Sequence, residues 1–190
     1  MCMQISQLIL GFVLLIPSLN CSQKKRVFLS ELTTSKGKTY YYNQNSESKD
    51  KESALYTGVA VDFYSKKQKK ITTSFKRGKK HGLSSSWYPS GQLKYEGNFN
   101  YGKKIGIHIG YWPKGNIRFE KKYINGQLNG QQNQWHDNGT LANLSNYATG
   151  KENGLQKGWR KNGDLRYNYQ MVNNKRYGFM GSRVCVPARI

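Results

Sequence analysis

A glycine recurs every 24 residues along most of this 190-residue chain. Three such series run in phase without a single insertion. Fourteen of the 20 glycines belong to them: Gly58, Gly82, Gly106, Gly130, Gly154 and Gly178; Gly78, Gly102, Gly126 and Gly150; Gly91, Gly115, Gly139 and Gly163. A period of this length is typical of an array in which each repeat is one supersecondary unit. The chain is therefore predicted to hold five repeat units, over residues 59–178.

Large apolar side chains recur at odd positions of the repeat, counted from residue 59. The fifth position holds Phe63, Trp87, Tyr111, Trp135 and Trp159. The eleventh, thirteenth and seventeenth positions hold comparable sets, which in the second unit are Leu93, Tyr95 and Phe99. Alternation with a period of two is typical of a strand with one buried face. The pattern predicts two strands in each unit, with all four columns on the same inward face.

Turn residues separate these strands. Pro89-Ser90-Gly91 lies between the two strands of the second unit, and Tyr101-Gly102 follows them. Proline presets a turn φ, and glycine accepts a positive φ, which tight hairpins require. A single hairpin cannot bury its face alone, so stacking makes the array stable. We expect an all-β fold, an elongated single-layer antiparallel β-meander of about five 24-residue hairpin repeats. The glycines that close each unit, such as Gly106, are expected to mark close backbone approach.

The second unit resembles a known repeat. Residues Trp87 to Gly106 read Trp-Tyr-x-x-Gly-x-Leu-x-Tyr-Glu-x-x-Phe-x-x-Gly-Lys-x-x-Gly, and the segments beginning at Tyr111 and Trp135 are further copies. This pattern resembles the MORN repeat in its bacterial variant form. The resemblance implies a surface that binds proteins or lipids, and some bacterial members are named as antitoxin-like proteins. It implies no catalytic residues.

The first 20 residues carry no charge and contain an apolar run, Leu8 to Leu19. This run is shorter than the roughly 20 residues that span a membrane, and it is typical of a secretory signal. Leu19-Asn20-Cys21-Ser22 resembles the lipobox of bacterial lipoproteins, although Asn20 replaces the usual small residue. The resemblance implies a signal peptide over 1–20, a lipid on Cys21 and a place in the cell envelope, periplasmic or attached to the outer membrane. An ordinary cleaved signal peptide and an apolar tail without a targeting role are the alternatives.

Two flanking segments are less regular. Residues 21–58 are expected to form an anchor and linker with an edge strand at Thr39 to Tyr42, and residues 179–190 a tail that covers the last strand. After removal of the signal and lipidation, Cys185 is the only free thiol. Its role is open between a buried small hydrophobe, which we favour, a reactive thiol and an intermolecular bridge.

The sequence offers no convergent catalytic group. The three histidines fall at different repeat positions, without the close spacing of metal ligands. Glu96 and Glu120 share one position in successive units and are expected to be solvated neighbours on the outward face. No phosphate loop or nucleophile elbow is present in the sequence. We therefore expect no enzyme activity, no cofactor and no metal.

Charge is the remaining signal, with 31 basic and ten acidic residues and a net charge of +21. The twelfth and sixth positions of the first three units place cations and aromatics on the expected outward face, as a candidate binding face: Lys70, Lys94, Arg118, Tyr64, Tyr88 and Trp112. The basic residues point either to an anionic partner or to simple solubility. The fourth unit carries one basic and two acidic residues, which interrupts the track that a nucleic acid would need.

Two functions remain. The first is a non-enzymatic envelope lipoprotein whose array is a scaffold for a protein partner or an anionic membrane or envelope component. The alternative is an antitoxin-like or immunity protein that neutralises a partner toxin by binding it. A toxin encoded beside the protein would favour the alternative.

Overall fold

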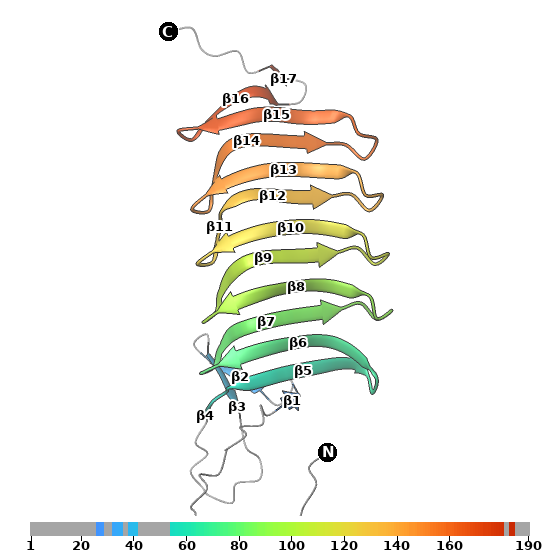
Figure 1. Ribbon diagram of the computed structural model, residues 1–190, viewed down its shortest axis with the longest axis vertical. Coiled ribbons are helices and arrows are strands. Elements are labelled where there is room, and N and C mark those ends of the chain that lie inside the picture. Colours follow the sequence, from blue (N-terminus) through green and yellow to red (C-terminus); the bar gives the residue numbers. More distant parts are fainter. Residues whose placement is uncertain (1–25, 29–31, 36–37, 42–53, 181–182, 185–190) are drawn as a thin grey trace, which may run out of the picture.

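The repeats build one open β-sheet. The computed structural model describes residues 26–28, 32–35, 38–41, 54–180 and 183–184, and every regular element among these is a strand. The large sheet has fourteen strands, and from β5 onward each strand pairs antiparallel with its neighbour in the chain. Figure 1 shows the strands stacked in a single elongated layer. The predicted all-β, single-layer antiparallel meander is confirmed.

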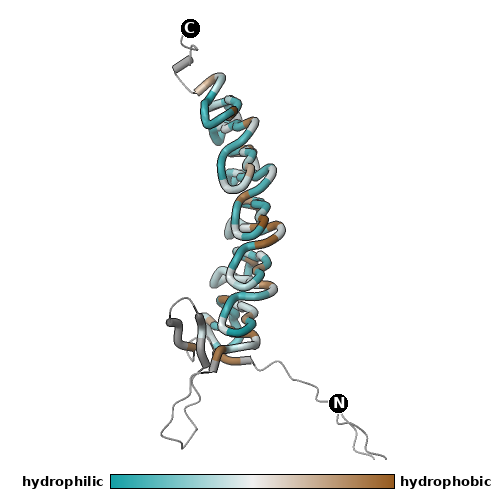
Figure 2. The backbone as a smooth tube through the Cα atoms, turned by 90° about the vertical axis from the view of Figure 1, so that its left-hand side faces the viewer, coloured by the Kyte–Doolittle hydropathy of each residue, from teal (hydrophilic) through white to brown (hydrophobic). Residues whose placement is uncertain are grey.

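Twelve strands make up the repeat region. They are β5 Gly58–Ser65, β6 Gln68–Lys76, β7 Lys79–Trp87, β8 Leu93–Asn100, β9 Lys103–Tyr111, β10 Ile117–Ile124, β11 Gln127–Leu128, β12 Gly130–Trp135, β13 Leu141–Ala148, β14 Lys151–Trp159, β15 Leu165–Val172 and β16 Lys175–Met180. The short β11 pairs with β10 beside β12. Figure 2, seen from the side, shows that the strands curve, so the sheet is bent across its width.

Other strands close the two ends of the sheet. β1, Arg26–Phe28, runs parallel to β5, and β17, Arg183–Val184, pairs with the end of β16, as expected for the tail. A separate sheet is made of β2 Leu32–Ser35, β3 Lys38–Tyr41 and β4 Ala54–Leu55. The predicted strand at Thr39 to Tyr42 exists as β3, but it is the central strand of this small sheet rather than an edge of the array.

Two kinds of turn alternate along the array. Tyr101 and Gly102 both have positive φ, 44° and 89°, as a two-residue hairpin turn requires. The N–H of Gly102 donates to the carbonyl of Lys80 in the preceding unit at 2.8 Å, and Gly126 repeats this contact with Lys104 at 2.8 Å. At the other side of the sheet, five-residue loops contain a glycine of positive φ, such as Gly91 at 91°. The predicted turn chemistry is confirmed, and hydrogen bonds join the two-residue turns of successive units.

The predicted single inward face is wrong. We call the face that carries the second, thirteenth, fifteenth and seventeenth positions the inner face, and the face that carries the first, third, fifth and eleventh positions the outer face. On the inner face, the rings of Tyr95 and Phe99 contact His108, with centroids 5.8 and 5.3 Å apart. The register slips by one residue where Ser86–Tyr95 pairing passes to Trp87–Leu93. This bulge inverts the alternation of side chains. The fifth and eleventh positions therefore lie on the face opposite to the thirteenth and seventeenth positions.

The prediction that the closing glycines mark close backbone approach holds at Gly178, where an added Cβ would lie 2.6 Å from the Asn168 carbonyl oxygen, but it does not hold at Gly106. A side chain added at Gly106 would meet no atom within 4 Å, although its φ is +69°. Close contacts with aromatic rings lie at three glycines outside the repeating series. An added Cβ would overlap the ring of His108 at Gly97, that of Phe119 at Gly110 and that of Tyr167 at Gly158. Aromatic rings of the inner face therefore pack directly against the backbone of these glycines.

Polar side chains form the most buried repeating column, at the second position of the second to fifth units. His108, Gln132 and Gln156 are 1%, 3% and 1% exposed. Each donates to the carbonyl ten residues earlier: His108 to Asn98 at 2.9 Å, Gln132 to Lys122 at 3.3 Å and Gln156 to Asn146 at 2.7 Å. The pairing between strands is irregular near these carbonyls, between Glu96 and Asn98 for example. Buried polar side chains thus complete the hydrogen bonding where the sheet bends.

Candidate binding face

The structure brings the six residues of the predicted binding face together in pairs. The Lys70 ammonium lies 5.9 Å from the centroid of the Tyr64 ring, and that of Lys94 lies 5.4 Å from Tyr88. The Arg118 guanidinium lies 5.2 Å from Trp112. These are cation–π distances. We call these three pairs the cation-aromatic row.

The row lies beside the inner face, not on the opposite face as expected. Arg118 also contacts the ring of Phe119, at 5.8 Å, and Phe119 packs on Gly110 of the inner face. Lys70 forms an ion pair, at 2.9 Å, with Asp62, which occupies the fourth position. The bulge explains this, because it brings the twelfth and thirteenth positions of the repeat to neighbouring places.

The aromatic members of the row also join consecutive units. Each donates a hydrogen bond to the carbonyl of the residue 23 positions later: Tyr64 to Trp87 at 3.2 Å, Tyr88 to Tyr111 at 2.9 Å, and Trp112 to Trp135 at 3.1 Å. His136 continues the series to Trp159 at 3.1 Å. Sequence reasoning missed this role, although the shared ability of Tyr, Trp and His to donate was visible in the column.

The cations of the row differ in their partners. The Asp62 carboxylate raises the pKa of Lys70, mainly by hydrogen bonding, and Lys70 in turn lowers the pKa of Asp62. Among the residues that the structure describes, neither Lys94 nor Arg118 forms an ion pair. The second and third units therefore present cations that only aromatic rings accompany.

An aromatic cluster surrounds His108. Its Nε2–H donates to Asn98, so its Nδ1 accepts from the Tyr95 hydroxyl at 2.5 Å and the ring is neutral. Burial lowers the pKa of His108, and the charge of Lys104 lowers it further. Burial also raises the pKa of Tyr95 to about 12. These shifts stabilise the neutral cluster, which packs beneath Tyr123.

The described residues contain no group of three histidine, cysteine or acidic side chains that could hold a metal. Glu96 lies on the outer face, where its carboxylate accepts a 3.4 Å hydrogen bond from the Tyr111 hydroxyl. Burial raises the pKa of Tyr111, and the charge of Glu96 and this hydrogen bond raise it further. No described side chains converge in an arrangement that would favour acid–base chemistry at Glu96.

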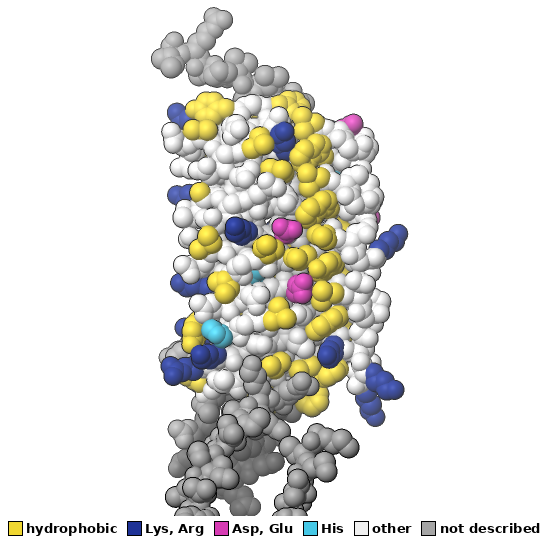
Figure 3. Space-filling view, in the orientation of Figure 1, with side chains coloured by type: hydrophobic (Ala, Val, Ile, Leu, Met, Phe, Trp, Pro, Cys, Tyr) yellow, Lys and Arg dark blue, Asp and Glu magenta, His cyan; other side chains and the backbone are white. Residues whose placement is uncertain are grey.

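The outer face carries a continuous apolar stripe. In Figure 3 a band of hydrophobic side chains runs along the array. Its register pairs come from the fifth and eleventh positions: Trp87 with Leu93, Tyr111 with Ile117, Trp135 with Leu141, and Trp159 with Leu165. Ile117 and Leu165 remain 39% and 45% exposed, because no second described layer covers them.

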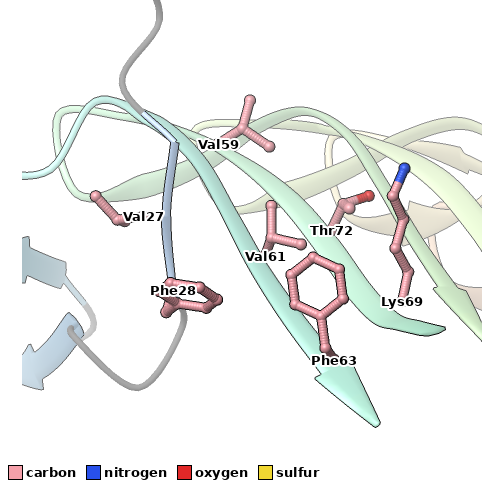
Figure 4. Close-up of a pocket in the computed structure, with 7 residues that line it drawn as sticks. All are labelled: Val27, Phe28, Val59, Val61, Phe63, Lys69 and Thr72. Carbon is pink, nitrogen blue, oxygen red and sulfur yellow. The ribbon is translucent and has the colours of Figure 1, made fainter. Parts of the chain in front are cut away.

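An apolar groove of about 400 Å³ lies at the amino-terminal end of the outer face. Figure 4 shows Phe28 of β1 beside Phe63 of β5, and their ring centroids lie 6.1 Å apart. Val59, Val61 and the stem of Lys69 form other parts of its wall. Val27, the neighbour of Phe28, points to the other side, where it is buried with Tyr56, Ala60 and Phe75.

Two cysteine predictions fall outside the described residues. These are the lipidation of Cys21 and the role of Cys185. No described helix is long and apolar enough to cross a membrane.

Comparison of the chain with protein-family models and with curated proteins finds no match. The candidate site consequently rests on the geometry of the repeats.

Proposed function

We propose that the array is a non-enzymatic scaffold that binds an acidic segment of a partner protein along the cation-aromatic row. The observation that carries this proposal is the geometry of the row. Three successive units hold a cation over an aromatic ring, at 5.9, 5.4 and 5.2 Å. The rings are themselves held by hydrogen bonds to the next unit. The aromatic surface beneath the cations is therefore preorganised, which lowers the entropy cost of binding.

The spacing of the row suggests the shape of the partner. Successive units are two strands apart, which places the cations roughly 10 Å from one another. A peptide in the polyproline II conformation advances about 3.1 Å per residue with three residues per turn, so an acidic side chain at every third residue would face one side and match this interval. A partner segment that presents this pattern on one side would meet Lys94 and Arg118, which have no acidic partner of their own among the described residues.

The bend of the sheet favours a protein segment over a flat bilayer. The row lies beside the inner face of a sheet whose backbone is bent (Figure 2), and a narrow chain can follow a bent surface more easily than a flat bilayer can. The row also ends at the fourth unit, where Ala142 takes the place of the cation. A long nucleic acid would need a continuous track.

A lipid on Cys21 would hold this scaffold at the cell envelope. This part of the proposal rests on the lipobox-like sequence alone. Globomycin blocks the signal peptidase of lipoproteins, so it should cause the unprocessed precursor to accumulate, and fractionation should place the untreated protein with membranes. A soluble protein with an intact Met1 would contradict the anchor without affecting the binding proposal.

The test of binding compares two double variants of equal net charge. Lys94→Gln with Arg118→Gln removes two cations of the row and keeps its aromatic rings. Lys79→Gln with Lys103→Gln removes two exposed cations beside the two-residue turns. The probe is a peptide with Glu at every third position, and isothermal calorimetry at low salt measures its affinity.

We expect the row variant to bind about tenfold more weakly, since each exposed ion pair contributes up to about 1 kcal/mol, and the turn variant to bind almost as the parent does. Equal losses in the two variants would reduce the interaction to general charge attraction. Stronger binding to vesicles with anionic lipid than to the peptide would favour a membrane partner and contradict the proposal.

A further inference from the structure

One unit breaks the repeat, and a cavity opens where it does. The twelfth position holds Lys70, Lys94, Arg118 and Arg166 in four units but Ala142 in the fourth. Ala142 lines a cavity of about 300 Å³ between the third and fourth units. This volume lies at the lower end of the range for small-molecule sites. The missing long side chain provides the physical reason for the cavity.

Two cations share one wall of this cavity. The guanidinium of Arg118 and the ammonium of Lys121 both lie over the ring of Phe119, 5.8 and 5.4 Å from its centroid. Arg118 also contacts Trp112, which forms another part of the wall. Within the described part of the chain, neither cation has a carboxylate at ion-pair distance. The cavity therefore combines positive charge with flat aromatic surface.

Lys121 has an unfavourable environment in the free protein. Its side chain is half-buried, and burial lowers its pKa. The charges of Lys104 and Arg118 lower it further. An anion placed between Arg118 and Lys121 would reverse this balance, because it would stabilise both charged forms.

A hydrogen-bond donor completes the wall. The Gln134 side-chain oxygen accepts from the amide of Asn143 at 3.1 Å, which orients the Gln134 carboxamide. Gln134 lines the same cavity, and its NH2 group forms no hydrogen bond with any other described residue. An amide N–H can donate to an anionic oxygen.

We propose that this cavity binds a small molecule that consists of an aromatic ring and one phosphate or carboxylate group. The anionic group lies between Arg118 and Lys121, and the ring lies against the aromatic wall near Trp112. The vacancy left by Ala142 accommodates the ligand. This site shares Arg118 and Trp112 with the row, but it does not depend on the proposed acidic segment and requires only the cavity and its two cations.

The probe is phenyl phosphate, with inorganic phosphate and benzoate as comparison ligands, and calorimetry on the full chain measures binding. We expect phenyl phosphate to bind with a saturable 1:1 isotherm and at least about tenfold more tightly than inorganic phosphate, because only the former buries a ring. Benzoate distinguishes a carboxylate site from a phosphate site. The absence of saturable phenyl phosphate and benzoate binding would overturn the proposal, and so would equal affinity for inorganic and phenyl phosphate.

Two variants locate the site. Ala142→Lys fills the cavity with a residue that the repeat uses at this position elsewhere, so it should preserve the fold while weakening phenyl phosphate binding at least about tenfold. Lys121→Met keeps the apolar stem and should weaken binding similarly. Lys103→Met, which removes an exposed cation that does not line the cavity, is the matched control and should leave affinity within about twofold.

Thermal unfolding confirms that each variant is folded before its affinity is interpreted. Unchanged binding in folded Ala142→Lys, or an equal loss in Lys103→Met, would place the ligand elsewhere and overturn the proposal. Failure of the acidic peptide to bind, with phenyl phosphate binding intact, would contradict the proposed partner but not this site.

Discussion

The inner and outer faces of the sheet carry side chains of similar hydrophobicity but differ in burial. Phe99 on the inner face is 9% exposed, whereas Ile117 and Leu165 on the outer face are 39% and 45% exposed. All three belong to columns that recur every 24 residues. The comparison teaches that a repeating hydrophobic column need not be a core. In a single-layer sheet, the burial of a side chain depends on the direction in which the sheet bends and on the aromatic rings that pack against that side chain.

The burial of polar side chains is the opposite of what hydrophobicity alone would predict. The most buried repeating column contains His108, Gln132 and Gln156, while aliphatic side chains of the outer face remain in water. The polar residues are buried because they hydrogen-bond to backbone where the pairing is irregular. Bending the sheet thus creates a need for hydrogen-bond partners that a flat hairpin would not have.

The largest expected difference between the faces concerns large-to-small substitutions. Phe99→Ala should lower the free energy of unfolding by about 3 to 5 kcal/mol, because it removes a buried ring and its contact with His108. Ile117→Ala on the outer face should cost less than about 1 kcal/mol, since its side chain is partly hydrated already. Urea unfolding of both variants measures the difference. Equal losses would mean that the outer stripe is also buried in solution.

The packing of the Phe119 ring on Gly110 gives a second test of how tightly the inner face is packed. Gly110→Ala should destabilise the protein by about 1 to 3 kcal/mol, because the added Cβ overlaps the ring of Phe119. Phe119→Ala in the same chain should remove the overlap, so the two losses should not add. A double-mutant cycle by urea unfolding measures this coupling. Simple additivity would indicate that the ring does not lie on Gly110.

The buried amides provide a test of the polar column. Gln132→Leu should lower stability by about 1 to 3 kcal/mol, because the side chain bonds to both the N–H and the carbonyl of Lys122 and leucine bonds to neither. Gln127→Leu, at an exposed position in the preceding unit, should stay within about 0.5 kcal/mol of the parent. Chemical unfolding compares them. A neutral Gln132→Leu would show that water satisfies these backbone groups.

The smallest expected effect is a dependence of stability on pH. The folded state lowers the pKa of His108 from its ordinary value of 6.5, so the unfolded chain takes up the proton first on acidification. Stability from this group is complete above pH 6.5 and is lost as the pH falls toward the folded pKa, by at most about 1.4 kcal/mol per pH unit.

His108→Gln introduces the residue that the fourth and fifth units carry at this position. It should keep the inner face folded and reduce the slope of unfolding free energy against pH between pH 7 and pH 5. The parent and the variant share all other titrating groups, so the difference between their slopes isolates His108. Identical slopes would contradict a buried neutral imidazole.

Much of the fold could be predicted from local chemistry. Glycines such as Gly91 and Gly102 have the positive φ that their turns require, and Asn174 adopts the same left-handed conformation at 61°. Strand alternation between turns was enough to predict a meander of hairpins. These features depend only on residues close together in the chain, which is why a single unit reveals them and five copies make them certain.

The faces could not be predicted in the same way. A one-residue bulge between Leu93 and Tyr95 reverses the side on which every later residue of the strand lies. The candidate residues were correctly grouped as neighbours, since Arg118 does contact Trp112, but their face was wrong. The role of Gln132 was missed because a lone polar residue in a strand carries no sign of the carbonyl it will meet.

The sequence by itself determined the period, the turns and the antiparallel order of the strands, because backbone preferences and short-range alternation act within each unit. Only the tertiary structure decided which columns are buried, which polar side chains complete the bent backbone, and that Ala142 leaves a cavity beside Arg118 and Lys121. Those outcomes depend on the register and curvature of neighbouring strands. Register and curvature are set jointly by residues that lie in different units of the repeat.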